Sequence, residues 1–335
     1  VSFYFYNEEN RQILSIDGAG SVKEIAYDLI GRVSKTTQYR QVFTDTNLLQ
    51  QYASGGAVFG PSGWESQVRS KLVASANDQI EYRTYDANNH LQSIVTGTGE
   101  VTTFLRDGNG SLMEQRTYYN RIQVGGTGGW VPGTFPQPVR DDLFDQWTRN
   151  AYDSLGRVVV TVNAVGSATK LSYDAAGNVT QRISYAKPIK VSNGAWDESF
   201  IFELAAQEGT AENVVIKNTY DAANRLTWTA DGTGAVTHLR YDRDGNTIKK
   251  VRFATAIGRA ATPQSASQTA NDVITDYVYD KAGRLTYTVE TNGATTRNIY
   301  DRNGNLKQRI EYATAITPPV FKPNGVFGPS EISNY

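Results

Sequence analysis

The chain alternates apolar and polar residues with a period of two over many short stretches. Leu285, Tyr287 and Val289 alternate with threonines, and residues 226–230 repeat this order with Leu, Trp and Ala in the apolar places. Successive side chains of an extended strand point to opposite faces, so the pattern is typical of antiparallel strands with one packed and one solvated face. The sequence therefore predicts a protein built mainly of half-buried β-strands.

A six-residue turn frame separates these stretches, and Tyr-Asp-Lys-Ala-Gly-Arg at 279–284 is one copy. The ten frames start at residues 6, 27, 85, 106, 152, 173, 220, 241, 279 and 300. Tyr opens every frame except the one at Arg106, Asp is second in every frame except at Asn7, and the fifth residue is always Gly or Asn. Gly and Asn take positive φ most readily, so each frame predicts a tight hairpin closed by a G1 bulge.

The Asp and Gly of a frame have separate predicted roles. We expect the Asp carboxylate to accept hydrogen bonds from backbone N–H groups inside its turn, and the Gly to adopt the left-handed conformation. The predicted structural turn residues are Asp28, Gly31, Asp153, Gly156, Asp174, Gly177, Asp242, Gly245, Asp280, Gly283, Asp301 and Gly304.

The frames come in pairs whose starts lie twenty-one residues apart, and each pair contains a further Gly between its two turns. An aromatic residue follows each pair, so the repeating unit has about 34 residues and occurs five times. The predicted units are 6–39, 85–118, 152–185, 220–253 and 279–312. Each unit predicts four strands, which gives an all-β chain of about twenty strands. Strand twist accumulates, so we expect this long antiparallel ribbon to coil into a spiral shell or solenoid.

Inserts of different lengths separate the units. They span 40–84, 119–151, 186–219 and 254–278, and residues 313–335 begin like a further insert. Helical spacing of apolar residues predicts short helices over 197–209 and 64–76, whereas the Gly- and Pro-rich stretch 125–138 predicts a loop. We expect all units and inserts to form one array over 1–335, and we interpret the chain as a fragment of a longer repeat array.

Composition narrows the functional classes. The chain has 33 basic and 34 acidic residues, a net charge of −1, no cysteine and two histidines. The balanced charge disfavours a nucleic-acid partner, and no apolar run is long enough to predict a membrane span. The absence of cysteine excludes disulfides, cysteine nucleophiles and thiolate metal sites. No cofactor is predicted.

The frame resembles a known repeat. Tyr-Asp-x-x-Gly-Arg and Tyr-Asp-x-x-Gly-Asn, as at 152–157, 173–178, 279–284 and 300–305, are similar to the YD repeats of the Rhs family. That family includes bacterial Rhs toxins, the cocoon component of insecticidal toxin complexes and teneurins. The resemblance covers all five units. It implies a β-ribbon that spirals into a hollow shell, which encloses a C-terminal effector in the toxins and supports cell-surface recognition in teneurins.

Candidate chemistry outside the turns is sparse. His90 and His238 occupy polar positions of the repeat, and no catalytic triad is recognisable. The Asp-x-Asn-x-Asn order at 301–305 puts oxygens at alternate positions, but its Gly is fourth rather than sixth, so turn geometry explains it better than calcium does. Trp64, Trp130, Trp147 and Trp196 fall in the predicted inserts, where they either anchor the insert or mark a contact surface, and Trp130 and Trp196 are the candidate ligand contacts.

Two functions follow from these observations. The first is a non-enzymatic structural fragment of a bacterial Rhs/YD-repeat protein, secreted or at the cell surface, that encloses or displays a toxin or effector. Its partner would then be the rest of its own longer chain, including an enclosed C-terminal effector. The alternative is an adhesin that binds carbohydrate or a cell-surface protein through its inserts.

Overall fold

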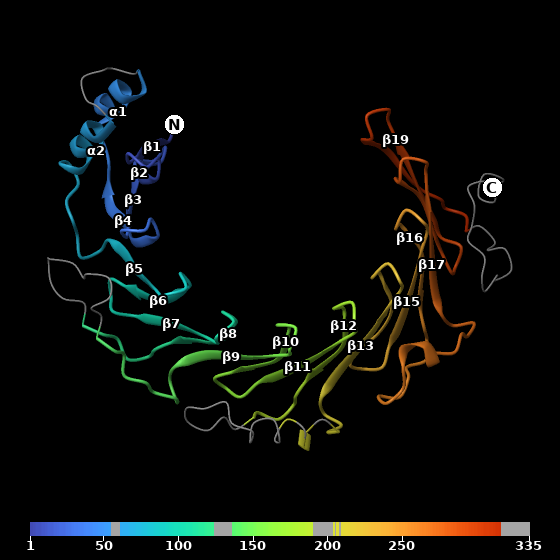
Figure 1. Cartoon of the computed structure of the whole chain (residues 1–335). Helices are drawn as coiled ribbons and strands as arrows, with labels where there is room; N and C mark the ends of the chain where they lie inside the picture. Colours follow the sequence, from blue (N-terminus) through green and yellow to red (C-terminus); the bar gives the residue numbers. More distant parts are fainter. Residues whose placement is uncertain (55–60, 124–135, 190–203, 205, 208, 316–335) are drawn as a thin grey trace. The chain divides into compact units, whose positions relative to one another are not determined.

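The computed structural model describes residues 1–54, 61–123, 136–189, 204, 206–207 and 209–315. The chain divides into two compact units: one comprises 1–157 with 162–164, the other 158–161 with 165–335. Twenty strands, all antiparallel to their neighbours, belong to one sheet, which confirms the predicted all-β ribbon. Figure 1 shows the strands in chain order.

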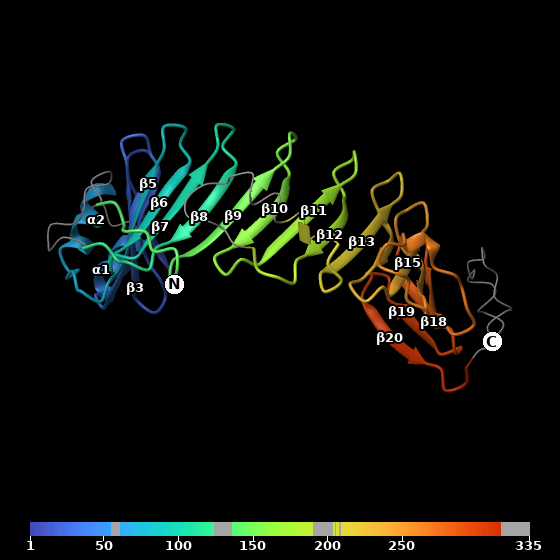
Figure 2. The ribbon, with the colours of Figure 1, turned by 90° about the horizontal axis from the view of Figure 1, so that it is seen from below.

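In the first compact unit, sequential strands pair with each other, and Figure 2 shows β5 to β9 side by side. These strands are β1 (Phe3–Tyr6), β2 (Gln12–Ile16), β3 (Ser21–Tyr27), β4 (Val33–Val42), β5 (Gln79–Tyr85), β6 (Leu91–Thr96), β7 (Val101–Arg106), β8 (Leu112–Thr117) and β9 (Gln146–Tyr152). Strand β10 (Val158–Asn163) contributes residues to both compact units.

The second compact unit repeats this order. Its strands are β11 (Ala168–Tyr173), β12 (Val179–Ser184), β13 (Val214–Tyr220), β14 (Leu226–Ala230), β15 (Val236–Tyr241), β16 (Thr247–Arg252), β17 (Val273–Tyr279), β18 (Leu285–Glu290), β19 (Thr295–Tyr300) and β20 (Leu306–Glu311). Strands β5, β9, β13 and β17 occupy the last part of the segments that the sequence predicted as inserts. Each insert is therefore shorter than predicted, because the strand that enters the next turn has to pair with the strand before the insert.

One face of the sheet is apolar and the other is polar. Opposed residues such as Ala230 and Val236, or Val251 and Ile274, are buried on one face. Threonines such as Thr229 and Thr237 lie opposite each other on the other face. This arrangement follows from the alternation in the sequence. The described part of each insert begins by folding over the apolar face, as Ile122 does against Tyr82, Val95 and Val101.

Two helices cover this face near the N-terminus (Figure 1). Helix α1 (Thr46–Ala53) begins after Asp45, whose Oδ1 accepts the Leu48 N–H at 3.0 Å. Helix α2 (Pro61–Arg69) buries Trp64 and Val68 in a cluster with residues of β1 and β2. Helix α1 was not predicted from the sequence. The helix predicted over 64–76 begins and ends earlier in the chain than predicted. The real helix starts at Pro61, a residue that favours the first helical turn, and ends at Arg69.

A short 3-10 helix, η1 (Pro263–Ser265), lies in the insert between β16 and β17. The predicted helix over 197–209 and the predicted loop over 125–138 fall largely outside the described residues.

Candidate functional site

The ten turns share one hydrogen-bond pattern, which Asp280 illustrates. Its Oδ1 accepts the N–H groups of Ala282 at 2.9 Å and Arg284 at 3.0 Å, and its Oδ2 accepts Nε of Arg284 at 2.8 Å. Gly283 has φ of 72°. The N–H of Arg284 and then its guanidinium hold the pKa of Asp280 below its ordinary value. The Asp280 carboxylate therefore bonds the backbone and the Arg284 side chain within its own turn and fixes the conformation of that turn.

The other predicted turn residues take the same geometry. All seven frame glycines have φ between 72° and 94°, and Asn10, Asn89 and Asn224 have φ between 59° and 68°. This agrees with the Gly or Asn restriction in the sequence. The carboxylates that accept the N–H of the residue four places later include Asp28, Asp153, Asp174, Asp242 and Asp301.

The frame tyrosines join each turn to the one before it. The Tyr241 hydroxyl donates to the Leu226 carbonyl at 2.7 Å, and Tyr300 donates to the Leu285 carbonyl at 2.9 Å. In each case the acceptor is the residue that follows the preceding frame. The same contact is made by Tyr27, Tyr85, Tyr152, Tyr173, Tyr220 and Tyr279. Arg106, which stands in the place of a Tyr, donates instead to Gly110 within its own turn.

The opposite ends of the strands carry the inserts, and each insert closes on itself at a neck. At the neck after β16, Asp272 Oδ1 accepts the Ala254 N–H at 2.8 Å, so the first and last residues of the insert meet. We call this contact the insert neck. The equivalent bonds join Arg40 to Asp78, Tyr119 to Asp145 and Ala186 to Asn213 at 2.8–3.0 Å. Asp or Asn seven residues before a frame is the sequence signal that identifies the neck, and sequence reasoning missed it.

A second bond at each neck explains the Gly between the two turns of a unit. The Ile257 N–H donates to the Gly234 carbonyl at 2.9 Å, and Phe43, Ile122 and Ile189 make the same bond to Gly20, Gly99 and Gly166. Gly234 has φ of 83°, and a Cβ on it would lie 2.3 Å from the Ile257 carbonyl oxygen. Only Gly allows the insert backbone to approach so closely.

A buried charge cluster interrupts the apolar face between β8 and β9. Arg116 is 1% exposed and binds Glu114 at 2.7 Å, Asp145 at 2.8 Å and Asp142 at 3.1 Å. Arg149 binds the other oxygen of Glu114 at 2.6 Å. Burial raises the pKa of Glu114, but the bonds from Arg116 and Arg149 outweigh it and hold that pKa below its ordinary value. The cluster fastens the end of the insert to the sheet.

The second compact unit has a smaller buried pair. Lys249 Nζ lies 2.9 Å from Asp276 Oδ1, and both side chains are about nine-tenths buried. Burial raises the pKa of Asp276 despite the opposing effect of Lys249. One strand away, His238 stacks on Trp228 with ring centroids 3.8 Å apart, and burial followed by repulsion from Arg240 lowers its pKa to about 4. His238 is therefore neutral at pH 7.

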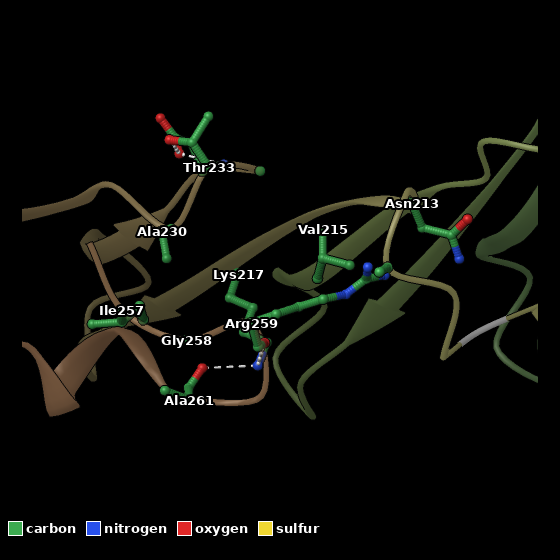
Figure 3. A pocket seen from close by; sticks show the side chains of 13 residues that line it. Asn213, Val215, Lys217, Ala230, Thr233, Ile257, Gly258, Arg259 and Ala261 are labelled. Carbon is green, nitrogen blue, oxygen red and sulfur yellow. Dashed lines mark hydrogen bonds between the residues drawn. The ribbon is translucent and has the colours of Figure 1, made fainter.

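A small cavity of about 150 Å³ lies beside the neck of Asn213. Figure 3 shows Lys217 reaching the Ala261 carbonyl, and its Nζ donates to the carbonyls of Arg259, Ala260 and Ala261 at 2.8–3.1 Å. The thirteen lining residues include no His, Cys or Glu. Within this lining, Thr233 Oγ1 donates to Asp231 Oδ1 at 2.6 Å inside its own turn, and Lys217 binds the backbone of the insert.

A family model described as RHS Repeat matches residues 152–187. These residues include one complete pair of turns, and the other four units repeat its spacing. The eight tyrosine contacts described above span all five units. Residues 152–187 therefore form a recognisable RHS repeat within the array.

Solved structures similar to this chain come from Tc toxins. The TcdB2-TccC3-Cdc42 structure is 15% identical over 92% of this chain, with a TM-score of 0.30. TcdB2-TccC3 without its hypervariable C-terminal region is 14% identical over 94%, with a TM-score of 0.31. The Photorhabdus luminescens Tc holotoxin pore is 15% identical over 94%, with a TM-score of 0.30. The chain spans 18% of the length of each. No curated protein matches its sequence.

The tryptophans of the chain occupy different places. Trp64 is buried in the cluster of helices and strands, so it anchors its insert. Trp147 lies in β9 rather than in an insert, because the strand begins at Gln146, and its ring contacts Arg149. Trp130 and Trp196 lie outside the described residues, and their assignment as ligand contacts stays a prediction.

Both histidines make local contacts. His90 lies 3.2 Å from Asp86 within its own turn, as the frame arginines do elsewhere. Among the described residues, no three His, Asp or Glu side chains gather as metal ligands, and no helix is long and apolar enough to cross a membrane.

Proposed function

We propose that this Rhs ribbon is a structural wall, a segment of a β-shell that encloses or displays a toxin or effector carried by the same longer chain. One observation supports it most: the recurring polar side chains bind the backbone of the ribbon itself. Frame aspartates fix turns, frame tyrosines join turns, and neck residues close inserts. A chain whose repeated polar groups are used in this way is suited to persist as a scaffold.

The architecture supports a wall in a second way. The twenty strands form one antiparallel sheet. Such a sheet has only two edge strands with unpaired backbone groups, however many strands it contains. Twist between strands coils such a ribbon, and coiling would let it surround a volume. We infer that the chain is non-enzymatic and that its parent is a secreted bacterial toxin component.

Protection from proteolysis tests enclosure directly. The full gene product that contains residues 1–335 would be treated with protease in parallel with a variant carrying Gly234→Val, which is designed to open one neck. We expect the segment downstream of the ribbon to resist digestion in the parent and to be cleaved in the variant. Equal cleavage of that segment in both proteins would contradict enclosure while leaving the scaffold role in place.

A second role, contact with a protein partner through an insert, is favoured by an exposed apolar patch. Tyr119 and Phe144 have ring centroids 5.0 Å apart and are 64% and 56% exposed, beside exposed Val139 and Leu143. Large exposed apolar groups of this kind mark contact surfaces. A glycan array and pull-downs with Tyr119→Ala would separate this role from that of a passive wall, for which no saturable binding is expected.

A further inference from the structure

The strands that join consecutive repeat units contain one cross-strand pair whose chemistry changes from junction to junction. The pair is formed by the residue eight places after the start of a unit's second frame and the residue three places before the next frame. We call it the junction pair. The four junction pairs are Lys35 with Tyr82, Glu114 with Arg149, Gln181 with Lys217, and Lys249 with Asp276.

Two of these junction pairs are buried ion pairs with opposite orientation. Glu114 is acidic and its partner Arg149 is basic, with 2.6 Å between Oε2 and Nε. Lys249 is basic and its partner Asp276 is acidic, with 2.9 Å between Nζ and Oδ1. A third pair places the Lys35 ammonium 5.5 Å from the Tyr82 ring centroid. The acidic residue therefore lies on the earlier strand at one of these junctions and on the later strand at the other.

This variation contrasts with everything else at the junctions. The backbone register is identical in all four, because each pairs the same position of a second frame with the same position of a first frame. The tyrosine contact across each junction is also the same in all four. Backbone and turns alone would therefore allow the last strand of one unit to pair with the first strand of any other, a known failure of repeat proteins.

The two ion-pair junctions discriminate against the exchange of strands between them. Pairing β8 with β17 would put Glu114 opposite Asp276, and pairing β16 with β9 would put Lys249 opposite Arg149. Each wrong pair would bury two like charges, which is strongly unfavourable. The correct order places a compatible partner at every junction.

We propose that the two ion-pair junctions exclude each other's strands during folding, so that β8 does not pair with β17 and β16 does not pair with β9. The stability of the folded chain and the accuracy with which its strands pair would then respond differently to changes in the junction pairs. Replacing a buried ion pair with apolar residues of similar volume often preserves or raises stability. The same replacement would remove the like-charge repulsion from the wrong pairing, which would then cost only the partner that Arg149 loses.

Cysteine cross-linking can test the proposal cleanly, because the chain has no native cysteine. Lys250 pairs with Thr275 on the face opposite Lys249 and Asp276. The K250C/T275C variant therefore reports the correct junction. Thr148 holds the position of Thr275 in β9, so K250C/T148C reports the wrong pairing of β16 with β9. Each pair would be treated with a short thiol cross-linker after refolding from denaturant.

Each reporter would be introduced separately into three backgrounds. These are the parent chain, the apolar replacement K249M/D276L, and the reversed pair K249E/D276K. We expect wrong cross-links at background level in the parent and several-fold higher in K249M/D276L. The reversed pair should also raise the yield of wrong cross-links, because the acidic residue would then lie on the earlier strand at both ion-pair junctions. Asp280→Ala, which weakens a turn in the same region, controls for lost stability and should leave wrong cross-links at background.

Two results would overturn the proposal. One is a wrong cross-link that stays at background in both replaced pairs, which would mean that the junction pairs only add stability. The other is an equal rise in Asp280→Ala, which would mean that any loss of stability produces misordering. If K249M/D276L does not fold, the reversed pair alone still distinguishes these outcomes.

Discussion

The two edges of the ribbon, where the strands end, use glycine for different reasons. At the edge that carries the frames, Gly156, Gly177 and Gly245 have positive φ, and a Cβ on them would meet nothing within 4 Å. At the edge that carries the necks, Gly99 and Gly234 also have positive φ, but a Cβ would lie 2.0 and 2.3 Å from a carbonyl oxygen.

This difference explains which residues each edge accepts. At the frame edge only backbone conformation is restricted, so Asn replaces Gly in three frames. At the neck edge the chain also passes against Gly20, Gly99, Gly166 and Gly234, so space is restricted as well as conformation, and this position is Gly in every unit. Conformation alone permits variation, whereas conformation combined with close packing does not.

The largest expected effect separates the two edges directly. Gly234→Ala should destabilise the protein by about 4 kcal/mol, because strain at positive φ adds to overlap with the Ile257 carbonyl. Gly245→Ala should cost about 1–2 kcal/mol, since it meets only the strain. Urea denaturation of both variants checks this, and equal losses would remove the proposed difference between the edges.

The neck aspartate should have the next largest effect. Asp272→Ala removes the acceptor for the N–H groups of Ala254 and Thr269, which we expect to cost about 2–3 kcal/mol. Asp272→Asn keeps an acceptor, as Asn213 does in another neck, and should retain most of the stability. Thermal unfolding of the two variants provides the comparison. If Asn is as damaging as Ala, charge rather than hydrogen bonding holds the neck.

At the frame edge, a β-branched residue and Asn should have different effects on the stability of the chain. Gly283→Val should be less stable than Gly283→Asn by about 1–3 kcal/mol, because a β-branched side chain is strained at positive φ whereas Asn tolerates it. A denaturation series measures the difference. Two variants of equal stability would show that the left-handed conformation at this turn carries no energetic weight.

The tyrosine contacts predict a pair of changes with opposite signs. Tyr241→Phe loses the bond to the Leu226 carbonyl and should cost about 1 kcal/mol. Arg106→Tyr should add about as much, because it places a hydroxyl where the other frames have one. Both effects are measurable by chemical denaturation, and a destabilising Arg106→Tyr would show that the arginine has its own role at that turn.

The smallest effect concerns acid. The pKa of Asp280 is lower in the folded chain than its ordinary value of 3.8, so its contribution to stability is present above that value and is lost as pH falls through the folded pKa. Asp280→Asn should flatten this part of the acid transition and retain the turn, as Asn7 does naturally. NMR titration of the Asp280 carboxyl would contradict the expectation if its pKa were 3.8 or higher.

Local chemistry made the strands and turns predictable from the sequence. Alternation gave the strands, and the Gly or Asn restriction gave the conformation at Gly283 and its equivalents. The necks were missed because they join residues such as Arg40 and Asp78, which lie far apart along a segment of variable length. The junction pairs were missed for a related reason: Glu114 and Lys249 look like ordinary strand residues until their partners across the insert are known.

Helices showed the limits of periodicity. Helix α1 has only two fully packed leucines, Leu48 and Leu49, so its apolar stripe is short, and its clearest signal is the capping Asp45. The displaced α2 illustrates a similar limit, since Leu72 still packs against the cluster although the helix ends at Arg69.

The necks bear on how such proteins diversify. A segment whose first and last residues are bonded to each other can lengthen, shorten or be exchanged without moving the strands that flank it. The inserts closed by the Arg40–Asp78 and Ala254–Asp272 bonds already differ widely in length around the same junction. Recombination could therefore graft foreign loops at these points, and a protein engineer could use the same four points to insert peptides for display.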